Sequence, residues 1–224
     1  KEVGSVFGEA FEGIGFETRW IEMPPDMNRA GHLFAETKGG KGKKLLLIGH
    51  LDTVFEEDSP FQEFERMNDS IAKAPGGNDM KGGNVIVLYA LKALYENRLL
   101  DDAQIIVAFT GDEESTGKPL DISRKDLVEA AKRSDVALGF ETSTGFNYAT
   151  VARRGASGWA LEVGGKRAHS SAVFSDRVGA GAIFEMSRIL HQFYTDVKGD
   201  DLLTFNPGIL MGGTFVDFDE KTSK

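Results

Sequence analysis

Three apolar runs of strand length constrain the fold of this chain more than any other feature. They are Lys43–Gly49, Gln104–Thr110 and Asp135–Phe140. A continuous apolar run of this length is typical of a strand that is buried on both faces of a sheet. Between the first two runs, Gly82–Asn97 carries a helical pattern, with apolar residues three and four positions apart. Strands that alternate with helices in this way predict an α/β fold.

Shorter elements are predicted around these strands. Ser123, with Asp126 three residues later, resembles a capping box, so we expect a helix from there to about Lys132. Both tryptophans, Trp20 and Trp159, are interpreted as core residues. The patterns near the start of the chain predict one helix followed by two strands, over Glu2–Gly13, Glu17–Ile21 and His32–Glu36.

The pattern changes near Arg154. Trp159–Val163 alternates in the manner of a half-buried strand, Val178–Tyr194 has the spacing of a long amphipathic helix, and Ile209–Phe215 is typical of a further strand. We therefore predict two domains: residues 1–152, and the start of a smaller α+β domain over residues 153–224.

Composition excludes several classes of function. The formal net charge of −9 argues against a nucleic-acid-binding surface, which is clustered and basic. No apolar run approaches the length that crosses a bilayer. The absence of cysteine removes disulfides, thiolate zinc sites and cysteine nucleophiles. The first residues read like the inside of a helix, so a signal peptide could have been removed upstream. The choice between cytoplasm and bacterial periplasm therefore stays open.

Acidic and histidine side chains follow each of the three buried runs. His50 and Asp52 come after the first, Glu113 and Glu114 after the second, and Glu141 after the third. In open α/β sheets the loops at the carboxyl ends of the strands converge, and ligands collect there. We therefore expect these side chains to lie along one edge of the sheet.

A further carboxylate, Asp79, lies directly before a predicted helix, where the positive helix end favours it. Taken singly, each residue is ordinary: a strand-end histidine is more often structural, and Asp79 could be a helix cap. Packed together without a cation, His50 and the three carboxylates of Asp79, Glu114 and Glu141 would cost roughly several kcal/mol in like-charge repulsion and desolvation. Nitrogen and oxygen ligands suit zinc, with cobalt and manganese as alternatives.

Two neighbouring acids are predicted to support such a site. Asp52 is placed to accept the second ring N–H of His50 and so to orient the imidazole. The side chain of Glu113 is expected to point away from that of Glu114 in an extended segment, which makes Glu113 a candidate general base.

At these residues the sequence resembles the co-catalytic dizinc exopeptidases, the family that includes glutamate carboxypeptidase, aminoacylase and succinyl-diaminopimelate desuccinylase. Around His50–Phe55 and Asp135–Thr142 it looks closest to glutamate carboxypeptidases. The resemblance implies a mixed, largely parallel sheet flanked by helices, followed by a small lid or dimerisation domain. The strings that carry it are Gly49–Val54, Asp79–Gly83, Gly111–Glu114 and Phe140–Glu141.

The resemblance also implies a role for each residue. Asp79 would bridge two zinc ions, His50 and Glu141 would complete one site, and Glu114 would belong to the other. Glu113 would take a proton from the water between the ions and pass it to the leaving amine. His169, at the start of the lid, would reach into the active site of a partner subunit in a homodimer and stabilise the oxyanion.

The sequence departs from the family pattern near its end. The family supplies one more histidine ligand and a clamp for the substrate carboxylate from later segments, and neither His32 nor His191 replaces that ligand. We therefore expect the C-terminal part of the catalytic domain to be absent and the second metal site to be incomplete in these 224 residues. Three functions stay open: cleavage of a C-terminal amide bond in a small peptide, hydrolysis of an N-acyl amino acid, and metal binding without catalysis.

Overall fold

The computed structural model of this chain describes residues 1–198 and 201–214. They form two units, one of Lys1–Ala149 and one that begins at Thr150, and each unit is described by itself. The boundary therefore lies three residues before the predicted start of the second domain. No helix in the described ranges has both the length and the apolar character to cross a membrane.

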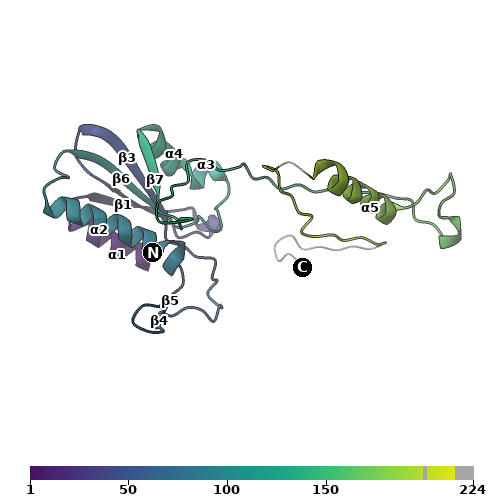
Figure 1. The fold of residues 1–224 in the computed structure, drawn as a ribbon, viewed down its shortest axis with the longest axis horizontal. Coiled ribbons are helices and arrows are strands. Elements are labelled where there is room, and N and C mark those ends of the chain that lie inside the picture. Colours follow the sequence, from purple (N-terminus) through teal and green to yellow (C-terminus); the bar gives the residue numbers. More distant parts are fainter. Residues whose placement is uncertain (199–200, 215–224) are drawn as a thin grey trace. The chain divides into compact units, whose positions relative to one another are not determined.

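A five-stranded sheet forms the centre of the first unit, with the strand order β1-β2-β6-β3-β7 (Figure 1). β3 pairs in parallel with β6 on one side and β7 on the other, whereas β1 and β2 are antiparallel to their neighbours. The predicted α/β fold with a mixed sheet, parallel at its centre, is confirmed. The strands are β1 (Glu17–Ile21), β2 (His32–Glu36), β3 (Lys41–His50), β6 (Ala103–Thr110) and β7 (Val136–Gly139).

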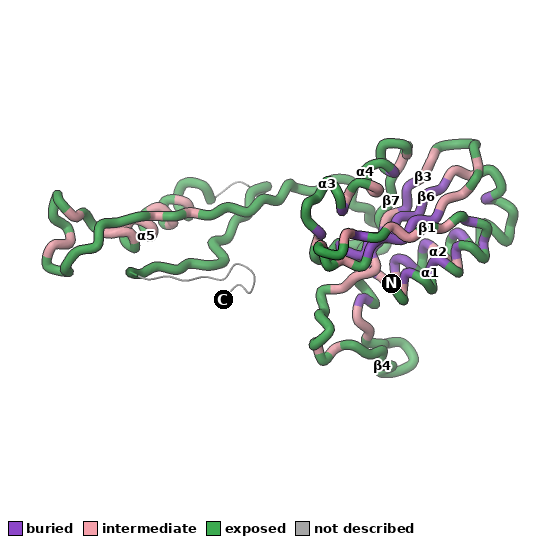
Figure 2. Tube along the Cα trace, turned by 180° about the vertical axis from the view of Figure 1, so that it is seen from behind, coloured by how far each residue is buried: buried purple, intermediate pink, exposed green. Residues whose placement is uncertain are grey.

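Helices cover both faces of this sheet. α1 (Glu2–Glu12) and α2 (Gly82–Glu96) pack on one face through Phe11 and Leu91, and α4 (Lys125–Lys132) packs on the other through Ala130. Side chains alternate between the two faces along each strand, which is the period of two that strands impose. Figure 2 shows the buried residues along the sheet and the inner sides of α1 and α2.

The loop after β3 carries a separate two-stranded hairpin, made of β4 (Glu65–Arg66) and β5 (Ala72–Lys73). Its residues are exposed, and it extends away from the sheet in Figure 1. The chain then returns to the sheet edge at the turn before α2.

The predicted capping box is wrong. Ser123 is the last residue of the short helix α3 (Leu120–Ser123), and α4 begins after it at Lys125 without a side-chain cap. The Ser123 hydroxyl is buried and donates to the carbonyl oxygen of Gly117. A tertiary partner has therefore taken the hydroxyl that a local cap would have used.

The second unit differs from its prediction. It contains a short 3₁₀ turn (η3, Ser170–Ala172), α5 (Ala182–Gln192) and a final π-turn (η4, Phe193–Val197). α5 starts four residues later than predicted because Gly179 and Gly181 have φ of 79° and 85°, a left-handed conformation that a helix excludes.

The two strands predicted for the second unit are wrong in the part of the chain that the structure describes. Trp159–Val163 and residues 209–214 form no strand, and Phe215 lies outside the described residues. Trp159 is 46% exposed and contacts Phe193 edge to face, so it is not a core residue. An alternating pattern forms a strand only where a neighbour completes its hydrogen bonds, and no described residue of this unit pairs with either segment.

Candidate metal centre

The carboxyl ends of β3, β6 and β7 bring the candidate residues to one edge of the sheet. His50 is the last residue of β3, Glu113 and Glu114 follow β6, and Glu141 follows β7 by two residues. The three strands are parallel and adjacent, so their ends lie together. This is the arrangement that places ligands at the edge of an open α/β sheet.

Asp79 reaches the same edge from a kinked turn, Gly77–Lys81, that leads into α2. Its φ and ψ of −122° and 96° are extended, whereas the next residue, Met80, is fully buried and fixes the turn against the core. The carboxylate of Asp79 therefore projects outward, with its side chain 62% exposed.

His50, Asp79 and Glu141 form a compact group. The Nε2 atom of His50 lies 3.1 Å from Oδ1 of Asp79 and 3.6 Å from Oε1 of Glu141. The imidazole is buried, whereas both carboxylates are partly open to solvent. One nitrogen and two oxygens within 4.8 Å of one another can bind a single divalent cation.

A second group shares the same histidine. Ligand atoms of His50, Glu113 and Glu114 also lie within 4.8 Å of one another. The expectation that Glu113 and Glu114 point in opposite directions is wrong, because both carboxylates offer an oxygen near the His50 ring. The segment is a bend followed by a turn, not the extended strand on which that expectation rested.

Asp52 connects the end of β3 to the loop after β6. Nδ1 of His50 lies 3.1 Å from the backbone oxygen of Asp52 and 3.4 Å from its Oδ1. The same carboxylate accepts backbone N–H groups from Glu113, at 3.1 Å, and Glu114, at 2.9 Å. Sequence reasoning missed this second task, since nothing local in the sequence indicates a bond between segments 61 residues apart.

Two asparagine side chains hydrogen-bond to His50 or beside the other candidate ligands, and sequence reasoning missed both. The side-chain amide of Asn84, which is fully buried on α2, donates to the backbone oxygen of His50 at 2.6 Å. Asn78 donates to Oγ1 of Thr142 at 3.0 Å. Asn78 and Thr142 adjoin Asp79 and Glu141, so their bond ties these two candidate ligands together. The only local signal was that Asn78 adjoins Asp79, whereas Asn84 lies between Gly83 and Val85 and carried none.

The charges at this edge perturb one another. Burial lowers the pKa of His50, but bonds to Asp52 and Asp79 outweigh it and raise the pKa to about 9. Burial raises the pKa of Asp52, but hydrogen bonds from His50 and the two backbone N–H groups outweigh it and lower that pKa. Burial, with nearby carboxylates, raises the pKa of Glu114 and of Glu141. Crowded carboxylates of this kind are stabilised by a cation, so the donor set fits a divalent metal.

The other histidines lie elsewhere. Nδ1 of His32 accepts the N–H of Gly111 at 3.1 Å, so its Nε2 carries the proton and donates to the oxygen of Ser123 at 2.8 Å. Both ring nitrogens are thus occupied within the protein. His169 and His191 belong to the second unit, where His169 is exposed and contacts Ser171.

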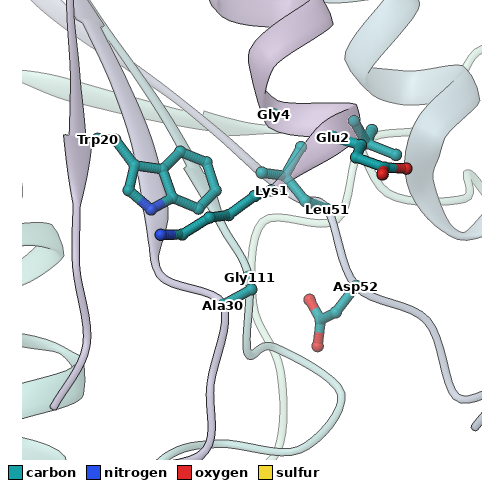
Figure 3. Close-up of a pocket in the computed structure, with 9 residues that line it drawn as sticks. Lys1, Glu2, Gly4, Trp20, Ala30, Leu51, Asp52 and Gly111 are labelled. Carbon is teal, nitrogen blue, oxygen red and sulfur yellow. The ribbon is translucent and has the colours of Figure 1, made fainter. Parts of the chain in front are cut away.

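A cavity of about 520 Å³ borders the site on the side of α1 (Figure 3). Trp20 and Lys1 line one part of it, and Leu51, Asp52 and Gly111 line the part nearest the sheet edge. Asp52 lines this cavity, and its side chain is 20% exposed although its carboxylate accepts hydrogen bonds from Glu113 and Glu114.

The candidate metal ligands and their position at the edge of the sheet agree with the family that the sequence matches. The family described as peptidase family M20/M25/M40 matches residues 46–200, which is more than half of the chain. This chain belongs to that family. It is 33% identical over 185 residues to carboxypeptidase G2 from Pseudomonas sp. (strain RS-16), a match that covers 81% of this chain and 43% of the relative.

Solved structures of the same family resemble the chain more remotely. An M20 family metallo-carboxypeptidase from Sulfolobus solfataricus is 20% identical with a TM-score of 0.48, over 62% of this chain and 32% of the other. Human carnosine dipeptidase 1 is 16% identical with a TM-score of 0.48, again over 62% and 32%. Both scores lie below 0.5, so the family assignment rests on the sequence matches. The chain spans less than half the length of the curated relative it matches.

Proposed function

We propose that this chain is the metal-binding part of an exopeptidase that hydrolyses a C-terminal amide bond in a small peptide, in the manner of a glutamate carboxypeptidase. The observation that carries the proposal is the cluster of one buried imidazole and four carboxylates at the end of β3. Membership of a peptidase family and the name of the curated relative support it.

The chain's own residues would hold two zinc ions. His50, Asp79 and Glu141 would form one set of ligands, and Glu114 would contribute to the second. When bound, the metal ions supply Lewis acidity, which polarises the scissile carbonyl and lowers the pKa of water. Asp52 keeps the imidazole of His50 facing the cluster through the contacts at its Nδ1 atom.

Glu113 is the proposed general base. Its carboxylate accepts a proton from the attacking water, the oxygen forms a bond to the carbonyl carbon, and the C–N bond then breaks as the proton passes to the leaving nitrogen. The carboxylate oxygen of Glu113 close to His50 and the bond from its backbone N–H to Asp52 support this assignment. His169 of a partner subunit is proposed to donate to the oxyanion in a homodimer that forms through the second unit.

The first test is metal content with hydrolysis of C-terminal glutamyl peptides, measured on the protein that carries this chain. About two zinc ions per chain with release of glutamate is the expected result, and release of an acyl group from N-acyl amino acids instead would redirect the substrate assignment. A protein that bound no metal would refute the metal centre itself.

The variant Glu113→Ala tests the base. It should keep its metal content and lose turnover by at least about 100-fold, since a positioned base contributes on the order of 10²–10⁴. Glu96→Ala, the same change at an exposed acid at the C-terminal end of α2, is the matched control and should keep full activity. Full activity in the Glu113 variant would remove the assignment.

A further inference from the structure

The segment that carries Glu113 and Glu114 is held by more than Asp52. The residue before it, Asp112, is fully buried, which is rare for a carboxylate unless its charge is paired. Its partner is Arg124, which lies between α3 and α4 and 12 positions further along the chain.

Arg124 binds both the side chain and the backbone of this segment. Its Nη1 donates to Oδ1 of Asp112, and its Nη2 donates to the backbone oxygen of Asp112 at 2.9 Å and to Oγ1 of Thr116 at 3.0 Å. The other carboxylate oxygen of Asp112 accepts the N–H of Gly117 at 2.9 Å. One guanidinium and one carboxylate thus close residues 112–117 into a loop of fixed shape.

His32 and Ser123 anchor the two ends of this loop. His32 accepts from the N–H of Gly111, which precedes the loop, and donates to the oxygen of Ser123. The Ser123 hydroxyl in turn donates to the oxygen of Gly117 at 2.7 Å, at the other end. His32, Ser123 and Asp112 are all buried. Polar bonds in such a setting are exchanged with water only at high cost, so they hold the two ends of the loop together.

We infer that Arg124 is a positioning residue for the Glu113–Glu114 segment: through Asp112 it orients the two backbone N–H groups toward Asp52 and so sets where both carboxylates lie. The inference rests on the proposed function for its catalytic consequence. A displacement of about 1 Å at a reacting group can cost about 100-fold in rate, so loss of the guanidinium should act on turnover.

The test compares two Arg→Met variants of the protein that carries this chain. Arg124→Met removes the pair with Asp112. Arg133→Met removes a similar forked pair, in which Arg133 donates to both carboxylate oxygens of Glu36 at 2.7 Å and 2.5 Å, away from the cluster. Both variants lose one Arg–carboxylate pair, but the carboxylate left behind is fully buried at Asp112 and 28% exposed at Glu36. A purely structural role therefore predicts a larger loss of stability for Arg124→Met, with kcat of the folded, zinc-loaded protein unchanged in both variants. Arg124→Lys keeps the positive charge but loses the planar guanidinium that donates to two partners at once. It replaces Arg124→Met in the test if that variant does not fold.

Four quantities are measured: kcat and KM on a glutamyl peptide, zinc content, and amide hydrogen exchange in a peptide that covers residues 111–117. Arg124→Met should lower kcat by about 100-fold at unchanged KM and zinc content, and it should speed exchange in that peptide. Arg124→Lys should lie between Arg124→Met and the parent, and Arg133→Met should match the parent in all four quantities.

Equal kcat and equal exchange in Arg124→Met and Arg133→Met would overturn the inference. A parent protein without zinc or hydrolysis would refute the proposed function instead. In that case faster exchange in Arg124→Met still supports the positioning role, and unchanged exchange rejects it.

Discussion

The two units of this chain use apolar residues in opposite ways. In the first, the sheet buries aromatic and aliphatic side chains on both faces, and Phe109 sits fully buried with Phe7 and Phe11 around it. In the second, none of the described residues is buried, and Phe184 and Phe174 lie against each other while both remain exposed. The difference teaches that an apolar pattern becomes a core only where a second layer is present to cover it.

Truncation of a large apolar side chain should separate the two units most strongly. Phe109→Ala should lower the free energy of unfolding by about 3–5 kcal/mol, because it removes a fully buried ring and leaves a cavity. Phe184→Ala, the same change at a ring that is 60% exposed, should stay within about 0.5 kcal/mol. Urea unfolding of both variants measures this, and a similar loss in the two would break the comparison.

Removal of a buried side-chain amide in the first unit should lower the free energy of unfolding by less than Phe109→Ala does. The same removal at an exposed amide in the second unit should have no effect. Asn84→Ala leaves the backbone oxygen of His50 without its buried donor, so we expect a loss of about 1–3 kcal/mol and weaker zinc binding. Asn206→Ala removes an exposed amide in the second unit and should change neither quantity. Denaturant unfolding and zinc titration test the pair, and an unaffected Asn84 variant would show that the contact does not position His50.

The smallest expected effect is a pH dependence of the free energy of unfolding that arises from the Arg133–Glu36 salt bridge. The hydrogen bond from Arg133 lowers the pKa of Glu36 below its usual value of 4.5. A lowered folded pKa stabilises the fold fully above the unfolded value, and this contribution is lost as the pH falls through the folded value. The stability difference between the parent and Glu36→Gln should therefore be below about 1 kcal/mol at neutral pH and shrink as the pH falls below 4.5.

An equivalent pair on α5 is the control for that prediction. Arg188 also lowers the pKa of Glu185, but this pair is fully exposed to solvent. Glu185→Gln should show a smaller pH-dependent difference than Glu36→Gln, because solvent screens the attraction. A larger difference for the exposed pair would contradict the ordering of the two units.

The sequence predicted the first unit well because its signals are local and mutually consistent. The apolar runs over Lys43–Gly49 and Gln104–Thr110 became β3 and β6, and the helical spacing over Gly82–Asn97 became α2. The convergence of His50, Glu114 and Glu141 followed from strand order, since parallel neighbours end at one edge, whereas Asp79 joins them from the turn before α2. Their assigned roles remain predictions.

Other features depended on contacts that lie outside the local patterns of the sequence. The capping-box pattern at Ser123 lost to a buried bond with Gly117, and the strand pattern at Trp159 had no neighbour to pair with. The direction of the Glu113 side chain could not be predicted, because a loop fastened by Arg124 replaced the extended segment.

What the sequence determined by itself was the α/β layering, the order of the acidic segments and the absence of any thiolate ligand, since period, spacing and composition are written along the chain. Only the tertiary structure decided that Asp52 binds the backbone of Glu113 and Glu114, that Arg124 closes their loop, and that His32 is committed to hydrogen bonds inside the fold. Hydrogen bonds of this kind join residues far apart in the chain. Their partners are chosen by burial in a particular packing, and no local pattern encodes that choice.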